Sequence, residues 1–230
     1  MMKQATQLKY GRTAVDVVAD YLFDEITTLR LLPGAKISEA DVAAQFSVSR
    51  QPVRDAFNRL ANLDLLLIRP QRATEVRRFS STAIEKSRYI RSAIEMDVLR
   101  RAASHCDEAG GKLLDACLVQ QQKACEANDY ASFSKHDYAF HKTLCDIAKA
   151  PFAFEVISDE KAKVDRLCLL SLSKEARMPE LIADHVEITR LVKNGQAQEA
   201  MDAGLKHLSR LDVTIEAIKA DNPDYFDDDA

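Results

Sequence analysis

Glycine and proline are scarce in this chain, with six of each among its 230 residues. That number leaves little material for the many tight turns of an all-β sandwich, and it excludes a collagen-like repeat. Residues with high helix propensity are plentiful. We therefore expect a mainly α-helical protein.

Long apolar runs are also missing. No segment approaches the roughly 18 consecutive apolar residues of a membrane span, and residues 1–10 are too polar for a secretory signal. We therefore expect a cytoplasmic protein with no membrane partner. The five cysteines form an odd set without a C-x-x-C spacing, which we interpret as small buried hydrophobes in a reducing compartment.

Charge is distributed unevenly along the chain. The net charge of −4 argues against a general nucleic-acid binder. Residues 1–78, however, hold 12 Lys and Arg against 9 Asp and Glu, whereas the remainder holds 20 against 27. The sequence thus predicts a basic N-terminal module followed by an acidic one, and we place their boundary at about residue 79.

The N-terminal module has the pattern of a helix-turn-helix. Val18, Leu22 and Ile26 repeat at helical spacing, and the PG pair at 33–34 ends this first helix. Ser38 is placed to cap a short second helix that runs to about Phe46. The SVS segment at 47–49 then forms a turn before the next helix.

The helix that follows carries a polar face suited to a DNA groove. Ser49 is placed as its N-cap, and Val53, Phe57 and Leu60 form its buried face. The opposite face presents residue types that contact bases and phosphates. With the cap, the candidates are Ser49, Arg50, Gln51, Arg54, Asn58 and Arg59.

A β-hairpin wing is predicted directly after this helix. Residues 65–68 and 75–78 form its two strands, and the turn between them carries the basic residue Arg72. A lone basic helix is more often a solvated surface, but a neighbouring helix and a wing favour DNA binding.

These segments resemble the winged helix-turn-helix of the GntR family of bacterial transcription regulators. The resemblance rests on LPG at 32–34, ISE at 37–39 and VSRQPVRDA at 48–56. It implies base or phosphate contacts for Arg50, Gln51 and Arg54, and a wing-tip contact for Arg72. The chain departs from the family at Asp64 and Ala73, where glycine is usual, and an alanine forced to positive φ at the wing tip would be strained.

Residues 82–220 have a helical pattern throughout. Breaks near residues 110–111, 128–129, 150–151, 178–179 and 194–195 divide them into six helices, which predicts an all-α bundle over residues 80–220. The last ten residues contain five Asp, and we expect residues 221–230 to be a disordered acidic tail.

Four side chains in the bundle have the chemistry of a metal site. Asp137 and His141 share one helix face at spacing i, i+4, while His185 and His207 lie on two later helices. An Asp with three His suits Zn, Ni or Mn. The spacing alone is weak, since any single His is more often bonded locally.

The bundle resembles the FCD domain, the ligand-binding domain of the FadR subfamily, in its six-helix, VanR-like form. The resemblance rests on RSAIE at 91–95, DYAFH at 137–141, DHVEI at 184–188 and HL at 207–208. It implies a divalent metal on Asp137, His141, His185 and His207, and a small organic acid held beside it. Arg91 and Arg166 are then the candidate carboxylate anchors, although surface salt bridges with Glu95 or Asp165 remain an equal alternative.

The combined resemblance predicts a homodimeric transcription regulator of the repressor type. It would bind a pseudo-palindromic DNA operator, because one helix and a wing contact too few base pairs for specificity alone. A small carboxylate would act as effector. Two alternatives stay open: a metal-dependent hydrolase-like enzyme, and a metal sensor in which the metal itself is the signal.

Overall fold

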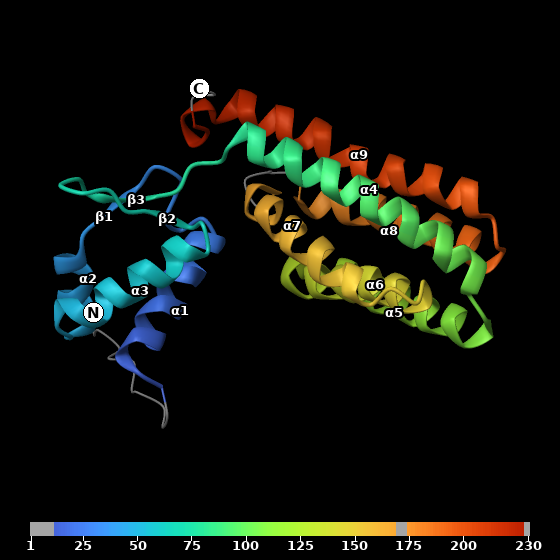
Figure 1. Cartoon of the computed structure of the whole chain (residues 1–230), viewed down its shortest axis with the longest axis horizontal. Coiled ribbons are helices and arrows are strands. Elements are labelled where there is room, and N and C mark those ends of the chain that lie inside the picture. The colour runs from blue at the N-terminus through green and yellow to red at the C-terminus, as the bar shows by residue number, and fades with distance from the viewer. Residues whose placement is uncertain (1–11, 169–173, 228–230) are drawn as a thin grey trace. The chain divides into compact units, whose positions relative to one another are not determined.

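The computed structural model describes residues 12–168 and 174–227, which divide into two compact units (Figure 1). The first unit holds residues 12–80 together with residues 222–227, and the second holds Ser81–Asp221. The expected fold class is confirmed: the chain is mainly helical, with a small sheet in the first unit. No described helix is long and apolar enough to cross a membrane.

Three helices form the core of the first unit: α1 (Ala14–Thr27), α2 (Glu39–Phe46) and α3 (Arg50–Asn62). The periodic residues Leu22, Ile26 and Phe57 are buried between them. Ser38 caps α2, since its side chain accepts hydrogen bonds from two backbone N–H groups of the first turn. Ser49 occupies the N-cap position of α3 but makes no side-chain cap hydrogen bond.

The wing is part of a three-stranded antiparallel sheet. The sheet has the order β1-β3-β2, with β1 at Lys36–Ile37, β2 at Leu66–Leu67 and β3 at Thr74–Val76. The predicted hairpin corresponds to β2 and β3. Strand β1 was not predicted, because its two residues are extended only through their pairing with β3.

The strain expected at Ala73 is absent. In the wing turn the positive φ of 58° belongs to Gln71, and Ala73 is not among the residues with positive φ. Asp64 does adopt a positive φ of 61° at the junction of α3 and the wing. This chain therefore accommodates both departures from glycine, because a polar side chain tolerates the left-handed region better than a branched one.

The second unit is a bundle of six helices over residues 81–168 and 174–221. Their bounds are α4 Ser81–His105, α5 Glu108–Glu126, α6 Tyr130–Ile147, α7 Phe152–Cys168, α8 Lys174–Lys193 and α9 Ala197–Asp221. The core between them includes Leu114, Phe140, Leu144, Ile188 and Val192. Of the described cysteine side chains only Cys145 is buried, so the expectation of buried thiols is wrong for Cys106, Cys117 and Cys125.

Two of the predicted helix breaks are wrong. Gly110 and Gly111 lie in the first turn of α5, where Asp107 caps the helix by accepting a 2.7 Å hydrogen bond from the N–H of Gly110. Pro179 lies inside α8. It is the sixth residue of that helix, so the backbone hydrogen bond that its ring removes is one near the helix start.

Helices α4 and α9 lie side by side along much of their length (Figure 1). Their close approach depends on Gly204, because a Cβ there would overlap the side chain of Leu99 on α4. Gly204 precedes His207 by one turn of α9.

The C-terminal segment is ordered, contrary to the expectation of a disordered tail over residues 221–230. Residues 223–225 form the 3-10 helix η1, and Phe226 is buried against Phe79 with ring centroids 5.6 Å apart. Two 2.8 Å backbone hydrogen bonds join Phe79 to Tyr225 and Asp227. Burial of the Phe226 ring therefore orders this segment despite its acidic composition. Residues 228–230 lie outside the described residues.

We expect Phe226→Ala to destabilise the first unit by about 3 kcal/mol, the usual cost of deleting a buried phenyl ring. The backbone N–H groups of Phe79 and Asp227 would then exchange with solvent faster. Hydrogen–deuterium exchange at residues 77–80 measures this directly. Tyr225→Ala serves as the control, and equal exchange in both variants would contradict a specific role for the Phe226 ring.

Candidate metal centre and DNA-binding face

Three helices of the second unit bring the three predicted histidine ligands together, with Asp137 beside His185. Asp137 and His141 come from α6, His185 from α8 and His207 from α9. The three imidazoles each offer a nitrogen within 4.8 Å of the others. His185 Nε2 lies 3.4 Å from His207 Nε2 and 3.6 Å from Asp137 Oδ1. All four side chains are buried.

Two of the three rings are held by an acceptor at their other nitrogen. Nδ1 of His141 lies 3.2 Å from Glu95 Oε2, and Nδ1 of His185 lies 2.9 Å from Gln121 Oε1. Nδ1 of His207 lies 3.5 Å from Asp184 Oδ2 and makes no hydrogen bond to a described residue. An acceptor at Nδ1 keeps the proton there and leaves Nε2 as a lone-pair donor, the arrangement usual for metal-bound histidines.

The electrostatics of the centre favour a neutral His185 ring beside ionised carboxylates. Burial and the neighbouring His207 lower the pKa of His185 well below its ordinary value, so this ring is neutral at physiological pH. Burial opposes ionisation of Glu95, but Arg91 and His141 outweigh it and hold the pKa of that carboxyl well below its usual range. A neutral imidazole can bind a cation without first losing a proton.

The residues present fit a metal ion. Nε2 of His141 is buried and has no hydrogen-bond partner among the residues that the structure describes. An orphaned buried nitrogen is costly unless something binds it, and the nearby nitrogens of His185 and His207 point to the same place. Three imidazoles and a carboxylate are a donor set for a divalent metal of intermediate softness.

A cavity opens beside these ligands. It is lined by Asp137, His141 and His207, by Arg91 from α4, and by Lys161 and Arg177 from α7 and α8. Lys161 Nζ lies 3.2 Å from Asp137 Oδ2. Burial raises the pKa of Asp137, but Lys161 and the three histidines outweigh it, so that pKa lies well below its ordinary value.

Of the two predicted carboxylate anchors, the structure describes one. Arg91 is buried, lines the cavity and donates a 2.8 Å hydrogen bond from Nε to Glu95. The alternative of a salt bridge with Glu95 is also present, although this pair lies inside the bundle and not on its surface. The side chain of Arg166 lies outside the described residues.

Several residues of the centre were not predicted from the sequence as parts of a site, Glu95 among them. Gln121, Lys161 and Arg177 stand in ordinary helical sequence, and nothing in their spacing marks them. Asp184 was noticed only as the neighbour of His185. Its carboxylate also accepts hydrogen bonds from Arg210, so two side chains of α9 contact Asp184 of α8.

We expect the stability of the bundle to fall in acid partly through Asp184. Burial raises its pKa, but its contacts with His207 and Arg210 outweigh burial and lower the pKa to about 2. The folded-state pKa lies below the unfolded value of about 3.9. Ionised Asp184 therefore stabilises the fold above about pH 4, and this contribution is lost as the pH falls towards 2.

Urea unfolding of chelator-treated protein between pH 3 and pH 7 measures this contribution. Asp184→Asn should lower the free energy of unfolding by about 2 kcal/mol at pH 7 and by less at pH 3. Asp146→Asn, which removes an exposed carboxylate of α6, is the control. Parallel pH profiles for Asp184→Asn and the unaltered protein would contradict the assignment.

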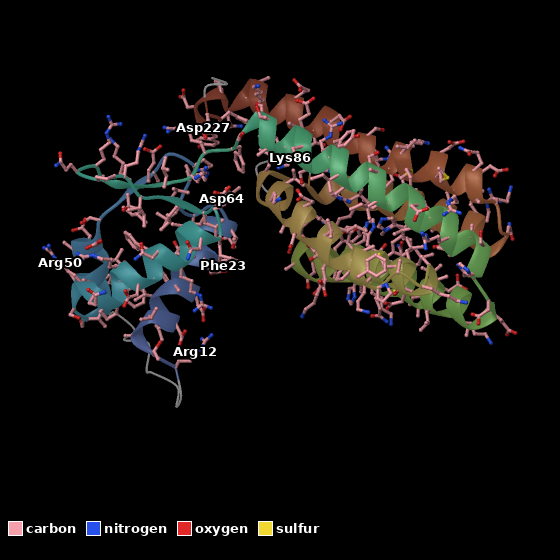
Figure 2. The ribbon with its side chains drawn as sticks, in the orientation of Figure 1. Arg12, Phe23, Arg50, Asp64, Lys86 and Asp227 are labelled. Atoms are coloured by element: carbon pink, nitrogen blue, oxygen red, sulfur yellow. The ribbon has the colours of Figure 1, made fainter. Side chains whose placement is uncertain are left out.

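The seven predicted DNA contacts are all exposed in the first unit. Arg54 donates two hydrogen bonds to Glu39 of α2, at 3.2 and 2.9 Å, and Arg59 pairs with Asp16 of α1. Arg50 has no hydrogen bond or ion pair to any described residue, and its side chain projects from the edge of the unit (Figure 2). The remaining candidates are Ser49, Gln51, Asn58 and Arg72.

Comparison with known families matches this division of the chain. Residues 14–76 match the bacterial regulatory proteins of the gntR family, and residues 88–210 match the FCD domain. The chain belongs to the GntR family. The HTH-type transcriptional repressor RspR of Escherichia coli strain K12 is 32% identical over 228 residues, which cover 99% of this chain and 100% of the relative.

Other relatives agree. An uncharacterized HTH-type transcriptional regulator in an unstable DNA locus of Streptomyces ambofaciens is 30% identical, over 96% of this chain and 92% of its own. A solved GntR-type regulator from Rhodococcus sp. RHA1 has a TM-score of 0.68 at 21% identity, covering 88% of this chain and 97% of its own. This GntR protein is therefore a transcription regulator, and its relatives are regulators and not enzymes.

Proposed function

We propose that this GntR regulator is a homodimeric repressor of the cytoplasm whose operator affinity is set by a small organic acid bound beside a metal. The observation that carries the proposal is the convergence of three buried imidazole nitrogens, two of them on rings anchored at Nδ1. Such anchoring fixes rings for a ligand that the rings share.

The metal would be held by Asp137, His141, His185 and His207. Zn, Ni and Mn all suit this donor set. When bound, the metal supplies a Lewis-acid position for a carboxylate oxygen. Arg91 stands at the wall of the same cavity, where its guanidinium can pair with that carboxylate, and Arg166 is the second candidate anchor.

The connection to DNA runs through α4 and α9. Arg91 and Glu95 lie on α4, whose first residue follows Ser80 of the DNA-binding unit, and His207 lies on α9, which leads into residues 222–227 of that unit. An effector that shifts α4 against α9 would therefore act on both chain connections. Its differential affinity for two arrangements of these helices shifts the population of DNA-binding dimers.

Dimerisation is supported by exposed apolar side chains on the bundle. Phe152 and Val156, one turn apart on α7, are 71% and 42% exposed. Large exposed apolar side chains that cluster usually mark an interaction site. Light scattering should give twice the chain mass of 25.7 kDa. Phe152→Asp should lower that mass, and an unchanged dimer would place the interface elsewhere.

The decisive experiment is operator binding with each component supplied separately. A duplex selected from a random library by the purified protein is titrated with chelator-treated protein, then with metal, then with metal and a panel of small carboxylates. The proposal predicts tight binding with metal and release, by about tenfold or more, only when an acid is added. Steep dependence on metal alone would favour a metal sensor instead.

A hydrolase is not supported. Asp137 is the single carboxylate among the described lining residues of the cavity, and Glu95 and Asp184 are occupied by Arg91 and Arg210. No described carboxylate is left beside the ligands to act as a general base.

A further inference from the structure

The lining of the cavity carries a surplus of positive charge. Three cationic side chains, Arg91, Lys161 and Arg177, face it together with one carboxylate, that of Asp137. The carboxylate of Glu95 lies behind Arg91 and partly balances it. A divalent metal on the histidines would add to the surplus, so the cavity is built for a ligand with more than one negative charge.

Lys161 is the cation closest to a predicted metal ligand among the described contacts of this cavity. Its side chain is only 12% exposed, and its Nζ lies 3.2 Å from Asp137 Oδ2 and 4.5 Å from the centroid of the Tyr138 ring. A metal bound at Asp137 would compete with Lys161 for the same carboxylate. A second anionic group on the ligand removes this competition, because it offers the ammonium group a countercharge of its own.

Arg177 provides the second cation on that side. It is half-buried on α8 and lines the same cavity, and no ion pair joins it to a residue that the structure describes. Other cations of the bundle differ in this respect: Lys163 pairs with Glu160 and Arg190 pairs with Glu187. A half-buried guanidinium that faces a cavity is suited to a carboxylate or phosphate.

We propose that the effector is a small dianionic acid, with one anionic group at the metal ligands and Arg91 and the other at Lys161 and Arg177. Apolar side chains, among them Phe133, Val164 and Leu181, line most of the rest of the cavity. The skeleton that joins the two anionic groups is therefore a short carbon chain. This inference rests on the proposed function. It assigns roles to Lys161 and Arg177, to which the proposed function gives none.

Isothermal titration calorimetry on the full chain tests the proposal with matched acids. Succinate is compared with butyrate, and malate with 2-hydroxybutyrate, because each pair differs by one carboxylate. 2-Phosphoglycolate supplies a phosphate in the second position. Metal-loaded protein should bind the tightest dianion at least about tenfold more tightly than its monoanionic counterparts.

Two variants locate the second anionic group. Lys161→Met and Arg177→Met should each reduce the preference for the dianion several-fold while leaving the affinity for the monoanion within about twofold. Lys163→Met, on the outer face of α7, should leave the preference unchanged. Circular dichroism and metal content of each variant check that bundle and centre are intact.

The outcomes separate the two proposals. Equal affinity for matched dianions and monoanions overturns the dianion inference and leaves the effector model standing. A preference that persists in both variants overturns the assignment to Lys161 and Arg177. If no acid of either kind binds metal-loaded protein, both proposals fail together, while the DNA-binding function is unaffected.

Discussion

Replacing His185 with alanine should reduce the metal content of the purified protein from about one equivalent per chain to almost none. His185 is fully buried, and its Nε2 is the nitrogen that lies close to both His207 and Asp137. Removing the ring takes away one donor and also the group around which the others converge. Loss of a residue that only hydrogen-bonds a metal ligand lowers metal affinity about 10- to 100-fold. We therefore expect loss of the ligand His185 itself to lower it more than about 100-fold.

Elemental analysis after dialysis against a weak chelator measures this effect. His105→Ala is the matched control, since that histidine is exposed at the end of α4 and bonds the carbonyl of Arg101. Gln121→Ala keeps all four ligands but frees Nδ1 of His185, and it should lower the affinity about 10- to 100-fold. Full metal content in His185→Ala would show that the ion binds elsewhere.

Replacing Arg50 with alanine should weaken specific operator binding about 10- to 100-fold, since a bidentate contact to a base contributes about 1–3 kcal/mol. Arg50 is a cleaner probe than Arg54, because Arg54 also ties α3 to α2 through Glu39. An exposed arginine without an ion pair costs the fold little when it is removed. Helicity and thermal stability should therefore stay unchanged.

Fluorescence anisotropy with the selected duplex, repeated over a range of salt concentrations, tests the role of Arg50. A phosphate contact would lower the salt dependence by about one ion per chain, whereas a base contact would relax the sequence preference. Arg30→Ala removes an arginine that pairs with Glu25 after α1, and it should bind normally. Unaltered binding by Arg50→Ala would contradict the placement of α3 in the groove.

Much of the fold could be predicted because its signals are local. The spacing of Val18, Leu22 and Ile26 predicts α1 by periodicity alone. The missed features depend on contacts between distant residues. Strand β1 exists only through β3, and the C-terminal segment is ordered only because Phe226 finds Phe79. Composition alone predicts the order of such a segment poorly, because burial of a single ring can make it ordered.

The metal centre could likewise be predicted only in part from the sequence. Asp137 and His141 lie one turn apart on one helix, so their shared face follows from sequence spacing. The acceptors that orient the rings do not follow from it. Glu95 and Gln121 reach His141 and His185 from helices far away along the chain, and each looks like an ordinary polar residue of a helix surface.

The ordered C-terminal segment makes the DNA-binding unit discontinuous in sequence. Its Phe79 is covered by a residue that comes after the whole bundle, so the chain passes between the units twice. A chimera that joins this DNA-binding unit to a foreign sensor after Ser80 would leave the Phe79 ring bare. Exchange of sensor domains in this protein therefore requires that residues 222–227 travel with the unit they complete.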